Sequence, residues 1–145
     1  MRLTLAAVVL TLAGCSKPAP QATTKQAAVE ITGPATTASK HPLAKYIELA
    51  GFRLAEAKPG QLDVKFVAVN HSEAELGDLS LSIRLRTTAS KPEDPPVAEF
   101  QAKVPALRPL EISDVDAKVN TKLRIYELPD WQFLRAEFDI TSPAP

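Results

Sequence analysis

The sequence has 145 residues, which is the usual length of one domain. Its 17 basic and 17 acidic side chains cancel, so no long-range field attracts nucleic acid, and we expect no nucleic-acid partner. The chain has a single cysteine, which excludes an internal disulfide. The fold must therefore be held by packing alone.

Residues 1–14 have the composition of an export signal. Arg2 supplies a positive start, and about ten apolar or small residues follow from Leu3 to Leu12. This run is too short to span a bilayer of roughly 30 Å, but its length is typical of a signal-peptide core.

The next residues, Leu12-Ala13-Gly14-Cys15, resemble the lipobox of bacterial lipoproteins. In that family the cysteine thiolate is alkylated with a diacylglyceryl group, and the three residues before it are recognised by the lipoprotein signal peptidase. The resemblance implies that Cys15 becomes the first mature residue and that its acyl chains anchor the protein to a membrane. Ser16 stands where aspartate favours inner-membrane retention, which implies an outer-membrane protein facing the periplasm. The alternatives are a Gram-positive surface lipoprotein and an ordinary secretory signal with a cysteine nearby.

Residues 15–42 are expected to be the lipidated cysteine followed by a flexible tether. Ala, Thr, Lys, Gln, Ser and Pro dominate this segment, and only the side chains of Val29 and Ile31 could be buried in a core. So few apolar side chains cannot offset the entropy of ordering the segment. The folded domain is accordingly predicted for residues 43–142.

Alternation of apolar and polar side chains predicts short strands beyond Pro42. The clearest is DLSLSIRLRT, residues 78–87, in which leucines and Ile83 share one face while serines and arginines share the other. Further strands are predicted at 46–57, 61–70, 97–104, 110–119 and 131–141. Residues 121–131 are expected to form a short strand with a corner, or one helical turn. Six or seven such strands without crossover helices predict an all-β fold, an immunoglobulin-like antiparallel β-sandwich.

The segment VKFVAVNHSEAELGDLSLSIRLRT, residues 64–87, resembles the centre of FxLYD-type immunoglobulin-like domains of bacterial envelope lipoproteins. In those domains an asparagine and a serine follow one strand and precede an alternating strand, as Asn70 and Ser72 do here. The resemblance implies a sandwich that binds or spaces other envelope components.

The sequence offers little for catalysis or metal binding. His41 and His71 have no partners at metal-ligand spacing, so no metal and no cofactor are expected. A nucleophile elbow and a phosphate-cradling glycine loop are both missing from the sequence, so we do not expect an enzyme. The Asn70-His71-Ser72 triplet matches a glycosylation acceptor, but Asn70 is expected to cap a turn with its side chain.

Arg84 and Arg86 are the candidate binding surface. They face outward on the predicted strand and could join Lys65 and Lys103 in a cationic strip that binds a glycan phosphate, an anionic polymer or an acidic partner. The alternative is a charged solvent face that prevents pairing of sheet edges.

Trp131 and Tyr126 are the other residues considered for recognition. A buried tryptophan beside a corner tyrosine is common in immunoglobulin-like sandwiches, so both are expected to pack in the core or at a corner. Recognition of a partner is the alternative.

Together these features predict a membrane-anchored envelope lipoprotein whose non-catalytic β-sandwich binds a protein partner, as an accessory subunit of an envelope assembly. The alternative is a binder of a small or polymeric anionic ligand, such as cell-wall glycan. A flat apolar patch or an unpaired strand edge would favour the protein partner, and exposed aromatics around a concavity would favour the ligand.

Overall fold

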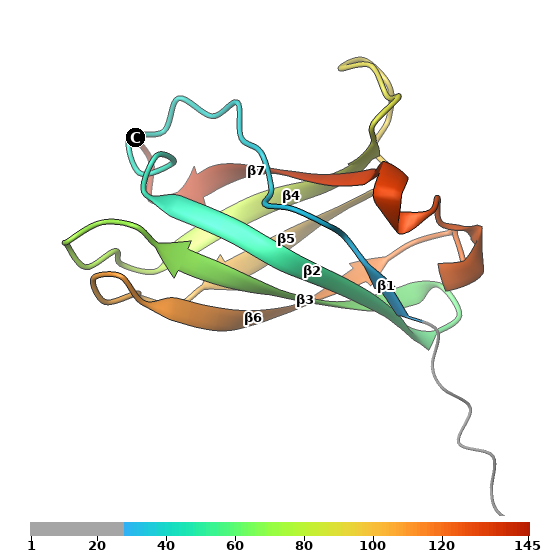
Figure 1. The fold of residues 1–145 in the computed structure, drawn as a ribbon, viewed down its shortest axis with the longest axis horizontal. Coiled ribbons are helices and arrows are strands. Elements are labelled where there is room, and N and C mark those ends of the chain that lie inside the picture. The colour runs from blue at the N-terminus through green and yellow to red at the C-terminus, as the bar shows by residue number, and fades with distance from the viewer. Residues whose placement is uncertain (1–27) are drawn as a thin grey trace, which may run out of the picture.

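The computed structural model describes residues 28–145, and within them the chain forms seven strands and two short 3-10 helices (Figure 1). The strands are β1 (Ala28–Glu30), β2 (Ile47–Lys58), β3 (Gln61–Asn70), β4 (Leu79–Thr87), β5 (Ala98–Val104), β6 (Ile112–Asn120) and β7 (Leu134–Ser142). The 3-10 helices η1 (Ile125–Glu127) and η2 (Trp131–Phe133) lie between β6 and β7. The four strands predicted between residues 46 and 104 are confirmed to within one residue at each end.

The strands form two packed sheets, one in the order β1-β2-β3-β6 and the other in the order β5-β4-β7. Every pair of neighbouring strands in these sheets is antiparallel. The pairing of β3 with β6 and of β4 with β7 corresponds to the B–E and C–F pairs of the immunoglobulin sandwich. The predicted all-β sandwich is confirmed.

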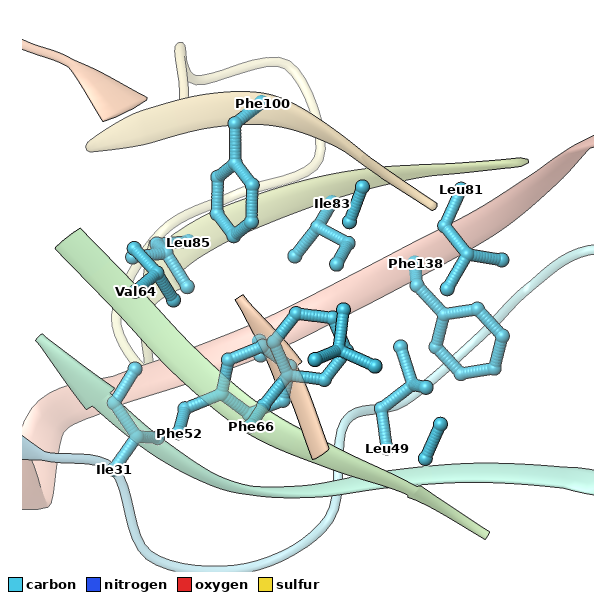
Figure 2. Close-up of a cluster of buried hydrophobic side chains, with 14 of the residues drawn as sticks. Ile31, Leu49, Phe52, Val64, Phe66, Leu81, Ile83, Leu85, Phe100 and Phe138 are labelled. Atoms are coloured by element: carbon cyan, nitrogen blue, oxygen red, sulfur yellow. The ribbon is translucent and has the colours of Figure 1, made fainter. Parts of the chain in front are cut away.

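Alternate side chains of the strands fill the space between the sheets (Figure 2). The inward residues of β4 are Leu79, Leu81, Ile83 and Leu85, each at most 1% exposed. Against them, the rings of Phe52 and Phe66 stack with centroids 4.7 Å apart. Burial of a side chain of this size stabilises the fold by about 1.5–3 kcal/mol.

A bulge in β2 keeps both halves of that long strand facing the core. Gly51 has a φ of 66°, and the register with β3 slips between Ala50 and Arg53. Leu49 and Phe52, three positions apart, therefore both point inward and are fully buried. Glycine adopts this left-handed backbone without the strain that a side chain would add.

The segment after β1 closes one side of the sandwich. Ile31 donates its N–H to the Phe52 carbonyl on β2 over 2.8 Å. Thr36 donates to the Ala136 carbonyl of β7 and accepts from the Phe138 N–H, each over 2.9 Å. The Ile31 side chain is 2% exposed and enters the core (Figure 2).

The flexible tether predicted for residues 15–42 is therefore wrong for residues 28–42. His41 is also buried, with its Nε2 2.9 Å from the Pro143 carbonyl oxygen. Backbone hydrogen bonds to two sheet edges hold most of this segment, and amino-acid composition does not reveal such bonds. The rest of the predicted tether, residues 15–27, lies outside the described residues, as does the predicted signal peptide at 1–14.

The two ends of the sandwich carry different loops (Figure 1). One end, called the β1 end, holds the start of β1, the β2–β3 turn, the β4–β5 loop and the β6–β7 connection; Thr88 there donates to the Phe133 carbonyl over 2.8 Å. The other, called the Asn70 end, holds the β3–β4 and β5–β6 loops, which meet at the Leu76–Leu107 bridge.

Candidate interaction surface

The outer face of the four-stranded sheet is divided into a charged half and an apolar half. The charged half lies toward the β1 end, where cross-strand ion pairs link β1 to β2 and β3 to β6. The pairs are Glu30–Arg53 (3.8 Å), Lys65–Asp116 (3.0 Å) and Asp63–Lys118 (3.8 Å). Ion pairs of this kind are exposed to solvent and contribute little to stability.

Lys65 is the cation in the middle of this charged half. The neighbouring Asp116 carboxylate, by its hydrogen bond and its charge, raises the pKa of Lys65 above its ordinary value. Lys65 therefore stays charged at neutral pH. Any stability that the Lys65–Asp116 pair contributes is present below the ordinary lysine pKa and is lost only as the pH rises through the raised value.

The apolar half lies toward the Asn70 end. In the strand register Ala50 faces Val67, and Val69 faces Ile112. Their neighbours in the chain, such as Ala68, are the side chains that point into the core, so these four point outward. We call Ala50, Val67, Val69 and Ile112 the apolar patch.

Ile112 is the most exposed member of the patch, at 64%. Leu110, two residues earlier in the chain, is 67% exposed. Polar groups border the patch: His71 Nε2 lies 2.6 Å from Glu48 Oε2, and Asp114 faces Val67 in the register. The arrangement of apolar side chains with a polar rim is typical of protein interaction sites.

The patch runs up to a free strand edge. β6 is the last strand of its sheet, and within residues 28–145 no strand pairs with its second edge. Three charged side chains, Asp114, Asp116 and Lys118, stand on the outer face along this strand. Charges of this kind protect an edge from unselective pairing, while Ile112 leaves its first residue apolar.

A buried polar network holds the loop before β6. The Asn70 side chain is fully buried, donates to the carbonyls of Ala74 (2.8 Å) and Arg108 (2.9 Å), and accepts from the Ser72 N–H (2.9 Å). The Ser72 carbonyl in turn accepts from the Leu110 N–H over 3.2 Å. The predicted turn-capping role of Asn70 is confirmed, and the network fixes Leu110 although its φ of 57° is unfavourable for leucine.

The two arginines predicted as a binding surface lie on the other sheet, and their charges are neutralised within the chain. Arg84 lies 2.5 Å from Asp139, and Arg86 lies 3.1 Å from Glu137. Arg86 also donates to the Asp94 carbonyl over 2.6 Å. A shallow cleft of about 460 Å³ adjoins both arginines. Their role in binding stays a prediction.

The predicted cationic strip does not form as a unit. Lys103 lies on β5, beside β4, and could join the arginines. Lys65 lies on β3 in the opposite sheet, where it pairs with Asp116. The alternation pattern gave the outward direction of each side chain, but it contains no information about which sheet a strand joins.

The prediction that Tyr126 and Trp131 pack in the core or at a corner is wrong. Tyr126 is 73% exposed and Trp131 is 52% exposed. Ile125 and Leu128 are the buried residues of this connection, and because 3-10 turns η1 and η2 replace an extended strand, the aromatic rings turn outward. Phe133, 50% exposed, belongs to the same set and was not singled out from the sequence.

Features of a metal site and of a membrane-spanning helix were also sought in residues 28–145. In this part of the chain no three histidine, cysteine or acidic side chains gather closely enough to hold a metal ion. None of the helices described there is long and apolar enough to cross a bilayer. The predicted lipidation residue Cys15 and recognition residues Leu12, Ala13 and Gly14 lie outside the described residues.

Comparisons with known proteins yield one structural likeness. No protein-family model matches the sequence, and no curated protein matches it. Among solved structures, the chain is similar to a DUF1425 family member from Shewanella sp. pv-4, with 15% identity and a TM-score of 0.32. That likeness covers 68% of this chain and 80% of the other.

Proposed function

We propose that this protein is a lipid-anchored lipoprotein of the bacterial envelope whose β-sandwich binds a protein partner without catalysis. The anchor is argued from the N-terminal sequence, in which a short basic start and an apolar run precede Leu12-Ala13-Gly14-Cys15. Ser16 favours the outer membrane, with the domain in the periplasm. The FxLYD-like segment at residues 64–87 is consistent with an envelope module of this kind.

The observation that carries the binding proposal is the apolar patch beside the free edge of β6. The patch is flat, because it is the surface of a sheet and not the wall of a cavity, and flat apolar surfaces suit proteins better than small molecules. An extended segment of a partner that added to β6 would gain main-chain hydrogen bonds and cover Ile112 in the same step.

The arginines of the other sheet argue less strongly for an anionic ligand. Arg84 and Arg86 already have carboxylate partners in Asp139 and Glu137. A phosphate or glycan would have to displace these carboxylates, which are held beside the arginines by strand pairing. The alternative ligand is therefore the weaker proposal.

Crosslinking in cells tests the proposed function. The lipidated chain with a C-terminal tag would be crosslinked and captured, and compared with Cys15→Ser, with the double variant Val69→Lys and Ile112→Lys, and with Lys118→Ala as the matched control. We expect one reproducible partner to be lost from the first two and retained by the control, because only these remove the anchor or charge the patch. A partner retained by the Val69→Lys and Ile112→Lys variant would refute the patch as its binding site.

A further inference from the structure

Three exposed aromatic side chains occupy one short stretch at the β1 end. Tyr126 is 73% exposed, Trp131 is 52% exposed and Phe133 is 50% exposed. We call them the aromatic triad. None of them lines the cleft beside Arg86 or the one between Leu43 and Leu76.

The segment that carries the triad is held in place. Arg124, just before η1, forms an ion pair with Glu56 on β2, and its N–H donates to Glu127 over 2.7 Å. Ile125 and Leu128 anchor the same turn in the core. The exposure of the rings is therefore set by the fold, and a group of exposed aromatic side chains is typical of an interaction site.

The start of β1 lies at the same end of the sandwich as η1 and η2, which carry the triad (Figure 1). Ala28 pairs with Ala55 on β2, and Ala55 precedes Glu56, the partner of Arg124. The Arg124 guanidinium lies 5.4 Å from the centre of the Tyr126 ring. Ala28 and Tyr126 thus lie close to each other at the β1 end.

The distance from Ala28 to Cys15 is limited by covalent geometry. Twelve residues, 16–27, separate Cys15 from Ala28. Twelve residues reach at most about 40 Å. If Cys15 carries acyl chains, the β1 end is therefore held near the bilayer surface at a high effective concentration.

The chemistry of the triad suits a membrane interface. Tyrosine and tryptophan are enriched at the level of the lipid headgroups, where an apolar ring and a polar tip are both accommodated. Around the triad, Lys122 and Arg124 are balanced by Glu127 and Asp130. The contact would therefore be apolar and not driven by charge.

We propose that the aromatic triad lies in the headgroup region of the membrane that carries the lipid anchor, and that this contact orients the sandwich. The proposal rests on the proposed lipidation of Cys15. It places the β1 end against the bilayer and the Asn70 end, with Leu110, Ile112 and the apolar patch, away from it. One acylated cysteine would limit only the distance of the domain from the bilayer, whereas the triad would set the orientation of the sandwich relative to the bilayer.

Trp131 provides the test, because it is the only tryptophan in the sequence. The full lipidated protein would be reconstituted into vesicles of phosphatidylethanolamine and phosphatidylglycerol, with and without brominated acyl chains. Flotation would report anchoring, and quenching of Trp131 fluorescence would report the contact. We expect flotation with quenching that persists at high salt, because the contact is apolar.

Matched variants distinguish the triad from the anchor. Tyr126→Ser with Phe133→Ser keeps the reporter and should lower the quenching by about twofold or more while flotation is unchanged. Leu110→Ser with Ile112→Ser, at the opposite end, should leave both readouts unchanged. Flotation of the wild type without quenching would overturn the proposed contact alone. Failure of the wild type to float would overturn the lipid anchor and the contact together.

Discussion

Asn70 connects the two loops at the Asn70 end of the sandwich. Its side chain lies fully buried and joins the β3–β4 loop to the β5–β6 loop through bonds to the Ala74 and Arg108 carbonyls. Removing the amide would take one donor from each of these carbonyls, and it would also remove the oxygen that accepts from the Ser72 N–H and hydroxyl. Breaking a buried network of this kind is costly, because water cannot replace all of the lost bonds.

Asn70→Ala is therefore expected to lower the free energy of unfolding by about 2–3 kcal/mol. Urea denaturation of the variant and of Asn120→Ala would check this. Asn120 is the matched control, because it is exposed and its side chain accepts only from Gln61, over 3.3 Å. Equal midpoints for the two variants would show that the network does not hold the loops.

Arg86 is an internal support of the β4–β5 loop. Its side chain is 13% exposed, and it binds Glu137 on β7 as well as the Asp94 carbonyl in the loop. We expect Arg86→Ala to lower the free energy of unfolding by about 2 kcal/mol and to increase proteolysis within residues 90–96. Lys103→Ala, on the exposed face of the neighbouring strand, should change neither. A loop equally resistant in both variants would contradict this structural role.

At the scale of elements, the segment from β1 to Thr36 acts as a strap across the sandwich. Its hydrogen bonds join β2 of one sheet to β7 of the other, and Ile31 fills the space between them. The opposite side, formed by β5 and β6, has no such strap within the described chain. Within residues 28–145 the edge of β6 is therefore open to a partner strand.

The strap predicts that the folded domain includes residues 28–42 as well as the predicted 43–142. Ile31→Ala should lower the free energy of unfolding by about 2–4 kcal/mol, since it leaves a cavity in the core. Val29→Ala is the matched control, because Val29 is only partly buried. Thermal unfolding measures both. If Ile31→Ala lowered the free energy of unfolding no more than Val29→Ala, the segment would not be part of the folded core, as the predicted tether requires.

The strands of the core could be predicted from the sequence, and the connections could not. The alternation over residues 78–87 identifies β4 because one face of that strand is fully buried. The position of Val67 and Val69 beside Ile112 depends on the register of β3 with β6, which the residue pattern within one strand does not contain. Tyr126 and Trp131 were misplaced because the sequence left a short strand with a corner and one helical turn as alternatives for residues 121–131, and the two 3-10 turns that form there direct both rings outward.

At the scale of the whole molecule, exposed apolar side chains occur toward both ends of the sandwich. The elements η1 and η2, which carry the aromatic triad, lie at the β1 end, and the β5–β6 loop, which carries Leu110, lies at the Asn70 end (Figure 1). A domain held at the membrane by its β1 end would display the patch to the periplasm. The proposed anchor, orientation and partner site are thus compatible in one arrangement.

Site-specific photo-crosslinking in cells tests the central claim, the binding of a protein partner at the patch, most directly. A photoreactive phenylalanine analogue would replace Ile112 in one lipidated chain and Gln101, exposed on the outer face of β5, in another. We predict a discrete crosslinked protein from position 112 and none from position 101. No product from position 112, or the same product from both positions, would contradict the account.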